Sequence, residues 1–181
     1  MGKPSLESVI QYWFDEMKPK YWFVCNAHID ANITARFGTL YEKLAAMKPA
    51  VSTAPVDTLA RIIVLDQFPR NMFRNTHRAF ATDALALALS KAGLEAGQDK
   101  GLTLTQKAFF YMPFMHSENA DDQERSLMLF SIPGLEDNYR FAIAHKAVID
   151  RFGRYPHRNA ALGRASTAKE EQFLQEPDSA F

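Results

Sequence analysis

Hydrophobic side chains recur in this sequence with the spacing of an α-helix, and this periodicity is the feature that most restricts the fold. The clearest stretch starts at Asp30, a candidate N-cap, and runs to Pro49. Its apolar residues stand three or four positions apart: Ile33, Phe37, Leu40, Tyr41, Leu44 and Met47. Alternating β-branched runs and Asn-Gly or Asp-Gly turns, which indicate strands, are nearly absent. The pattern therefore predicts an all-α protein.

Further helices are predicted wherever the same spacing ends at a proline or a glycine. Their expected limits are Leu6 to near Pro19, Asp57 or Thr58 to Pro69, Thr82 to Gly93 or Gly97, Leu104 to Pro113, Asn119 to Phe130, Asn138 to Gly153, and a last helix after Thr167 with a capping box to Glu170. Eight or nine helices in antiparallel pairs are expected. We predict one domain over residues 1–181, with flexible ends at about 1–4 and 176–181.

Composition excludes several classes of function. The chain has 21 Lys plus Arg and 21 Asp plus Glu residues, whereas nucleic-acid-binding domains are usually basic, so no nucleic-acid partner is expected. No apolar run approaches the length of a membrane span, and the N-terminus lacks the apolar region of a secretion signal, so no membrane partner is expected. Cys25 is the only cysteine and cannot form an internal disulfide. These features predict a cytoplasmic protein.

Polar residues concentrate in three blocks, each at a predicted helix break. The blocks are LDQFPRNMFRNTHRAF at residues 65–80, FFYMPFMHSENADDQER at 109–125, and IDRFGRYPHRN at 149–159. Functional groups are often displayed at such breaks, so we expect the ligand-facing residues here.

These blocks, together with FATDALALAL and RFGRYPHRNAALGRAST, resemble the bacterial domain-of-unknown-function family numbered 924. The resemblance covers nearly the whole chain, from Trp13–Phe14 to the Glu-rich C-terminal helix. It implies an all-helical, tetratricopeptide-like fold. It implies no activity, so the chemistry has to be argued from the residues.

Arginines dominate the first and third blocks. Their planar, forked guanidinium groups suit bidentate binding of a carboxylate or a phosphate. The alternative is that they pair with carboxylates in a purely structural network, since buried arginines are usually paired. The residues expected to bind a ligand are Arg70, Asn71, Tyr111, Gln123, Arg151, Arg154, Arg158 and Asn159.

Acid–base chemistry is the main alternative. His116 beside Glu118, or His157 beside Asp66, would form an imidazole oriented by a carboxylate, as in a hydrolase. The run His116-Ser117-Glu118 resembles half of a metal site that His145 or His157 could complete, but no H-E-x-x-H spacing supports it, so no metal is assigned. Glycine-rich phosphate loops are absent and no cofactor is expected.

Two functions therefore stand side by side: binding of a small anionic ligand or an acidic peptide end in an Arg/His/Asp-lined cleft, and hydrolysis by a His–carboxylate pair, metal-assisted or not. A second copy of the chain, in a homodimer, is a further expected partner. The neutral total charge also hides two opposed segments. Residues 116–137 hold six acids and one base, and residues 140–164 hold six bases and one acid. These segments are expected to fold against each other or to face a ligand between them.

Overall fold

The structure is a computed structural model that describes residues 4–177 and 179. Its elements are, in chain order, α1 (Leu6–Ile10), the π-helix η1 (Gln11–Glu16), η2 (Pro19–Tyr21), α2 (Ala27–Ala45), α3 (Pro55–Asp66), α4 (Phe68–Met72), η3 (His77–Ala79), α5 (Asp83–Glu95), η4 (Gln98–Gly101), α6 (Leu104–His116), α7 (Ala120–Phe130), α8 (Glu136–Phe152), η5 (Pro156–Arg158) and α9 (Ala168–Phe173). Within the described residues every regular element is helical, which confirms the all-α prediction. None of these helices is long and apolar enough to cross a membrane.

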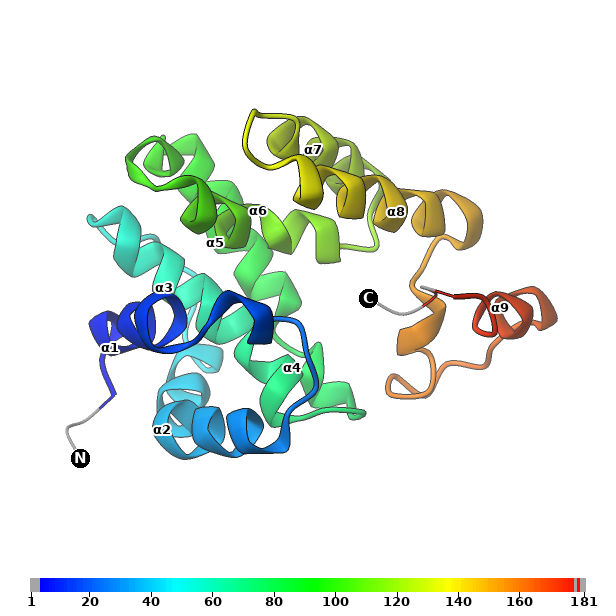
Figure 1. Cartoon of the computed structure of the whole chain (residues 1–181), viewed down its shortest axis with the longest axis horizontal. Coiled ribbons are helices and arrows are strands. Elements are labelled where there is room, and N and C mark those ends of the chain that lie inside the picture. Colours follow the sequence, from blue (N-terminus) through cyan, green and yellow to red (C-terminus); the bar gives the residue numbers. More distant parts are fainter. Residues whose placement is uncertain (1–3, 178, 180–181) are drawn as a thin grey trace.

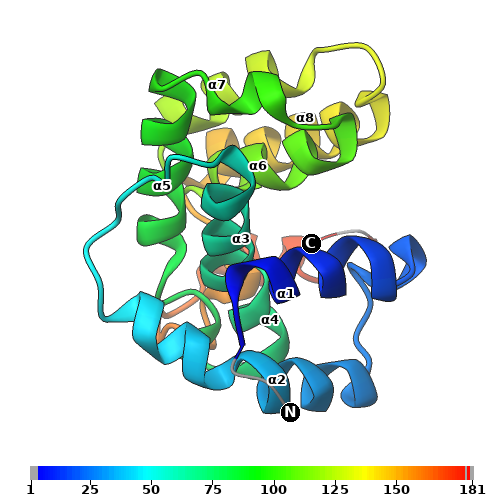
Figure 2. The same ribbon diagram turned by 90° about the vertical axis from the view of Figure 1, so that its left-hand side faces the viewer.

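Helix α3 runs through the middle of the N-terminal part of the chain, in contact with α1, α2, α5 and α6 (Figures 1 and 2). Its large aliphatic side chains Leu59, Ile62, Ile63 and Val64 are completely buried. Helices α6, α7 and α8 then pack in succession. The tetratricopeptide-like arrangement and the single-domain organisation stay predictions. The flexible ends expected at 1–4 and 176–181 lie partly outside the described residues.

Three predicted helix starts were wrong. Helix α8 begins at Glu136, two residues ahead of the expected Asn138. Helix α2 begins after Asn26, whose side-chain oxygen accepts the backbone N–H groups of His28 and Ile29 at 3.0 and 3.1 Å. The expected cap Asp30 lies inside the first turn. Helix α3 begins at Pro55, ahead of Asp57. The backbone N–H groups of the first helical turn have no partner within the helix, so proline, which has no N–H, is tolerated there.

Two predicted helix ends were also wrong, both at prolines. Pro69 lies in the first turn of α4 instead of ending α3, which stops at Asp66. Helix α6 passes through Pro113 and continues to His116. A proline inside a helix removes one backbone hydrogen bond, and here the last turn is covered by the buried side chains of Phe114 and Met115. The continuation matters because it determines where His116 lies.

The π-helix η1 positions the loop that follows it. The N–H of Met17 donates to the carbonyl of Tyr12, five residues back, at 2.9 Å. The carbonyl of Trp13 instead accepts the indole N–H of Trp22 at 3.0 Å. The wide turn thus supplies the acceptor that holds the residues around Trp22 against the core.

The C-terminal segment, from Gly153 onward, packs on the end of α8 and stands at one side of the molecule (Figure 1). It has a small hydrophobic cluster of its own, formed by Val148, Ile149, Tyr155 and Phe173. The capping box predicted at Thr167 and Glu170 is confirmed. The segment is tied to the rest of the chain largely by polar side chains, and these belong to the site described next.

Candidate functional site: a buried Asp–His pair beside two arginines

The end of α3 meets the end of α6 in a buried carboxylate–imidazole pair. Oδ1 of Asp66 lies 2.7 Å from Nδ1 of His116, and Asp66 is completely buried. The other oxygen accepts a hydrogen bond from the amide of Gln67 at 2.5 Å. Arg70, one turn further, places Nη1 3.6 Å from the same carboxylate. The sequence blocks at 65–80 and 109–125 thus converge.

The charges of this pair follow from its surroundings. Burial alone raises the pKa of Asp66, but His116, Arg70 and the hydrogen bonds outweigh it and hold the pKa well below its usual range. Burial and Arg70 lower the pKa of His116 more than Asp66 raises it. At neutral pH Asp66 is therefore ionised and His116 is neutral. Because a carboxylate only accepts, Nδ1 carries the proton and Nε2 is left as a base.

Asp83, at the start of α5, joins two arginines from distant parts of the chain. Arg70 donates to both of its carboxylate oxygens at 2.9 and 3.0 Å. Nη1 of Arg158, from η5, donates to Oδ2 at 3.2 Å. One carboxylate therefore serves two guanidinium groups, and it connects the first and third polar blocks.

Arg158 is 6% exposed and lies between two aromatic rings. Its guanidinium carbon is 4.7 Å from the ring centre of Phe80 and 4.5 Å from that of Tyr155. Burial lowers its pKa, although Asp83 opposes this. Its Nε is buried and donates to no hydrogen-bond acceptor among the described residues. The Nε–Nη2 edge is the side of a guanidinium that takes a carboxylate or phosphate bidentately, and Asp83 uses only Nη1.

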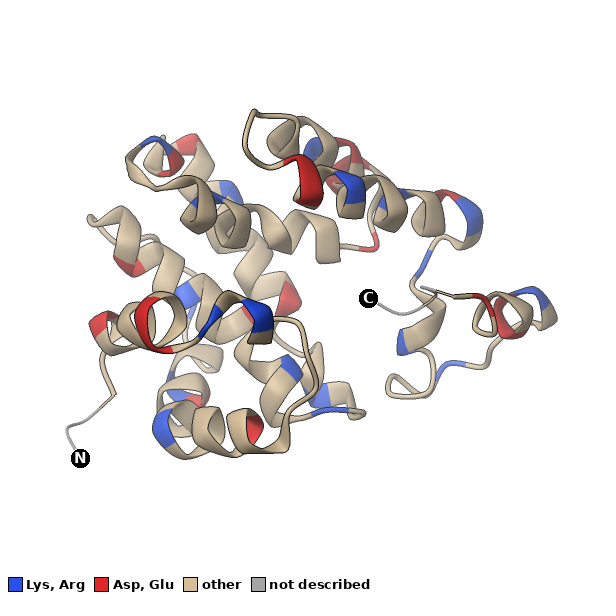
Figure 3. Cartoon of the chain, in the orientation of Figure 1, with Lys and Arg blue, Asp and Glu red and all other residues tan. Residues whose placement is uncertain are grey.

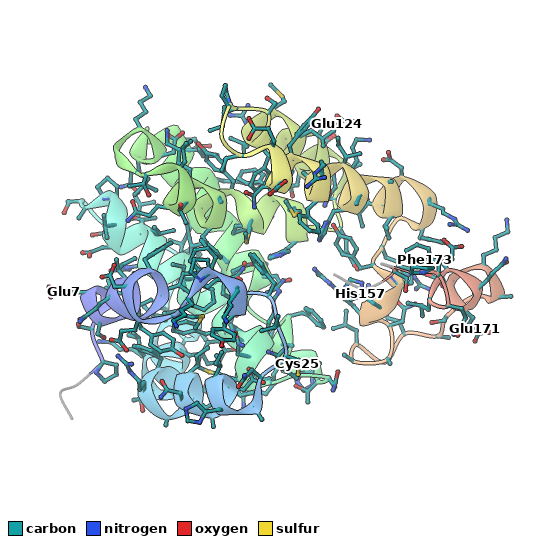
Figure 4. The ribbon with its side chains drawn as sticks, viewed as in Figure 1. Glu7, Cys25, Glu124, His157, Glu171 and Phe173 are labelled. Carbon is teal, nitrogen blue, oxygen red and sulfur yellow. The ribbon has the colours of Figure 1, made fainter. Side chains whose placement is uncertain are left out.

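Two more histidines and a tyrosine surround Arg158. The ring of His145 lies 6.4 Å from that of His116 and 5.6 Å from that of Tyr155. Burial lowers the pKa of His145 to about 3, and burial with the charge of Arg158 lowers the pKa of His157 to about 4. Figure 4 shows His157 on the turn that leads from α8 toward α9. All of these imidazoles are neutral at pH 7, so they add no charge to the site.

Tyr155 and Gln123 hold the segment in place beneath these rings. The hydroxyl of Tyr155 donates to the carbonyl of Met115 at 2.5 Å. The amide of Gln123 donates to the same hydroxyl at 2.8 Å and to the carbonyl of Ser117 at 2.6 Å. Gln123 is completely buried, so its role is to hold Tyr155 and Ser117 in place through these hydrogen bonds.

Glu118 has a different partner from the one expected. It binds Arg164 through both oxygens, at 2.7 and 2.9 Å, and accepts the backbone N–H of Tyr155 at 2.8 Å. The expected pairs His116–Glu118 and His157–Asp66 are wrong, because the structure pairs His116 with Asp66. The reason is topological: the C-terminal ends of α3 and α6 meet, whereas Glu118 turns toward the C-terminal segment.

The two oppositely charged segments do fold against each other in part. Besides Glu118 and Arg164, Glu124 of α7 lies 3.0 Å from Lys146 of α8. Figure 3 shows acidic and basic residues side by side on these two helices.

The remaining expected ligand residues lie outside the cluster. Tyr111 donates to Asp99 at 2.8 Å, and Asn71 donates to Asp30 at 2.8 Å. Asn159 is held by Arg164 and Ser166. Arg154 is taken up by both oxygens of Glu170, at 2.6 and 2.8 Å, and Arg151 reaches only to 3.9 Å from Glu176.

A surface depression of about 680 Å³ lies over Arg151, Arg154, Lys169 and neighbouring residues of α9. It is remote from the Asp66–His116 pair, and Glu170 already neutralises Arg154 there. Across the part of the chain that the structure describes, no group of three or more His, Cys, Asp or Glu residues is placed to hold a metal ion.

Sequence reasoning missed the two residues that organise Arg158. Neither Asp83 nor Phe80 is among the residues that were expected from the sequence to bind a ligand. Phe80 is the last residue of the first polar block, and Asp83 follows three residues later. The signal that could have identified Asp83 is a charged residue at the start of a helix immediately after that block.

Comparison with known proteins places the chain in a family. Residues 9–178 match the family described as bacterial protein of unknown function (DUF924). The chain belongs to this family. The DUF924 chain is also similar to the solved structure of a protein of unknown function from Agrobacterium tumefaciens, with 31% identity and a TM-score of 0.84 over 94% of this chain and 96% of that one. No curated protein matches it.

Proposed function

We propose that this DUF924 protein binds a small anionic ligand, or the acidic end of a peptide, through a carboxylate or phosphate group at Arg158. The observation that supports this is the buried Nε of Arg158, which has no acceptor among the described residues. Leaving a buried charged donor without a partner is costly. A bidentate anion on the Nε–Nη2 edge would remove that cost.

The charges around Arg158 are balanced. Asp83 carries one negative charge and is shared between Arg70 and Arg158. Asp66 lies 3.6 Å from Arg70, so the two aspartates balance the charges of the two arginines, and Arg158 offers an anion its Nε donor, unpaired within the described residues. His116, His145 and His157 have lowered pKa values and are neutral at pH 7, so they add no positive charge that would attract the anion.

Binding of acetate and of inorganic phosphate, measured by calorimetry and by the thermal shift of the protein, tests the proposal. Arg158→Lys keeps the charge but removes the fork, and we expect it to lose most of the affinity. Arg151→Lys makes the same change at an exposed arginine of neighbouring sequence and should bind like the original protein. Equal binding by both variants would exclude Arg158 as the anion site. A lower melting temperature in Arg158→Lys, with no binding by any variant, would leave only a structural network.

The Asp66–His116 pair supports a second candidate, hydrolysis of an ester or amide. A neutral imidazole held at Nδ1 by a buried carboxylate 2.7 Å away is arranged as a general base. Nε2 would take a proton from water, the hydroxide would add to the carbonyl, and the proton would pass to the leaving group. A panel of ester and amide substrates, with His116→Gln as control, tests this. Activity that survives the substitution does not use this base.

A cytoplasmic location and a homodimer complete the proposal. Neither bears on the geometry above, and light scattering on the purified protein measures the second directly.

A further inference from the structure

Two aromatic rings lie against the guanidinium group of Arg158. The guanidinium carbon is 4.7 Å from the ring centre of Phe80 and 4.5 Å from that of Tyr155. Guanidinium groups stack on aromatic rings through their flat faces. Tyr155 is completely buried, and its hydroxyl donates to the carbonyl of Met115 at 2.5 Å, so its ring is held in place. The faces of the group are covered by carbon, and its N–H donors point out along its edges.

The edges of the same group are divided between Asp83 and a free pair of donors. Nη1 donates to Oδ2 of Asp83 at 3.2 Å, and the buried Nε has no acceptor among the described residues. All donors of a guanidinium lie in one plane. The Nε–Nη2 edge therefore offers two parallel N–H groups to a ligand that brings two oxygens into that plane.

Phe80 is placed by the turn that also places Asp83. The backbone N–H of Asp83 donates to the carbonyl of Phe80 at 3.2 Å, and the N–H of Phe80 donates to the carbonyl of His77 at 3.2 Å. The ring of Phe80 also lies 5.7 Å from the guanidinium carbon of Arg70. One turn thus supplies the carboxylate that holds the two arginines and a ring that lies against both of them.

Planar and tetrahedral anions fit this edge differently. The two oxygens of a carboxylate lie in one plane and match two parallel donors. A phosphate or sulfonate that binds through two oxygens directs its other substituents out of the plane, toward the rings. An aromatic face is electron-rich and offers no donor, and a buried oxygen without a donor is costly. The rings therefore favour a planar head group.

The balance of charge favours a single negative charge on the ligand. Arg70 and Arg158 are matched by Asp66 and Asp83. A ligand on the free edge of Arg158 shares that guanidinium group with Asp83. Like charges repel strongly in a buried site, so a second negative charge on the ligand would meet Asp83 without a further cation to offset it.

We infer that the group bound by Arg158 is a carboxylate and not a phosphate or a sulfonate, and that Phe80 sets this selectivity. The inference rests on the proposed function, because it names the head group that Arg158 holds. Carboxylates of this chemistry occur in small organic acids and at the C-terminal end of a peptide.

Acetate and methanesulfonate separate shape from charge, because each carries one negative charge and one methyl group and only acetate has a planar head. By calorimetry at pH 7 and constant ionic strength, acetate should bind at least about tenfold more tightly. Inorganic phosphate, which carries more than one negative charge on average at this pH, should bind more weakly than acetate as well. Equal affinities for acetate and methanesulfonate overturn the inference and leave the anion site at Arg158 intact. Absence of binding by all three removes the proposed function itself.

Phe80→Leu tests the role of the ring, because it keeps an apolar side chain and removes the flat face. The preference for acetate over methanesulfonate should fall below about threefold. Phe73→Leu makes the same change at a ring that lies 3.8 Å from the guanidinium carbon of Arg78, and it should keep the full preference. Phe80→Met replaces the leucine variant if that variant does not fold. An unchanged preference in the folded variant overturns the role of Phe80.

Trialanine, with a free or an amidated C-terminus, distinguishes the two sources of the carboxylate. Binding of the free form at least as tight as that of acetate, with none by the amide, assigns the end of a peptide. Weaker binding of the free form than of acetate assigns a small organic acid. Equal binding of the free form and the amide contradicts a carboxylate head group.

Discussion

Lowering the pH from 6.5 to 5.0 should lower the free energy of unfolding, and His145 should account for a measurable part of this loss. Its pKa is about 3 in the folded chain and about 6.5 in an unfolded one. The unfolded state therefore binds more protons throughout this range, so stability is complete above about pH 6.5 and falls as the pH falls. For one such histidine the loss between pH 6.5 and 5.0 is about 1.6 kcal/mol. His157, with a pKa of about 4, adds a loss of the same sign.

Urea denaturation followed by tryptophan fluorescence, at half-unit steps of pH, measures this loss. In His145→Gln the dependence should be shallower by about 1.6 kcal/mol over the range, whatever the variant's stability at pH 7. His77→Gln is the matched control, because His77 is exposed and its removal should leave the slope unaltered. The reasoning is refuted if His145→Gln and His77→Gln have the same slope as the original protein.

Three further changes test the packing around the site. Asp83→Asn removes the negative charge shared by Arg70 and Arg158 and leaves buried positive charge uncompensated. It should lower the free energy of unfolding, measured in urea, by about 3 kcal/mol. A loss under about 1 kcal/mol would contradict the shared ion pair. Trp22→Phe removes one hydrogen bond and should cost about 1 kcal/mol by the same assay. Gly153→Ala should cost about 1 kcal/mol, because φ is +69° there, and a melting temperature equal to that of the original protein would speak against a strained turn.

The helices were predictable where the signal is local. Amphipathic spacing and the capping box at Thr167 depend on neighbours a few residues away, so the sequence contains them. The helix limit at Pro69 was mispredicted because a proline is tolerated in the first turn of a new helix. The limit at Pro113 was mispredicted because a proline ends a helix only if tertiary packing does not compensate for the lost hydrogen bond. At α6 the buried last turn compensates for it.

The segments that form the candidate site could be predicted from the sequence, but the pairs of residues that contact each other could not. Asp66 and His116 are 50 residues apart, and no local pattern says which carboxylate orients which imidazole. The sequence therefore identified both residues but assigned them to other partners. Tyr111 shows the same limit. Its position in the second block was apparent, but the side of α6 on which it lies depends on Asp99 and on the packing of η4.

The separation of 75 residues between Asp83 and Arg158 has a consequence for biosynthesis. Asp66, Arg70 and Asp83 are made long before Arg158, and His116 is made between them, nearly midway from Asp83 to Arg158. The large core can form while the segment after Gly153 is still absent, because that segment packs mainly on α8. In such a nascent chain Asp83 would pair with Arg70 alone, and the guanidinium group of Arg158 would be missing. The proposed anion site would be completed only once Arg158 has been made, after the core that holds Asp83 is in place.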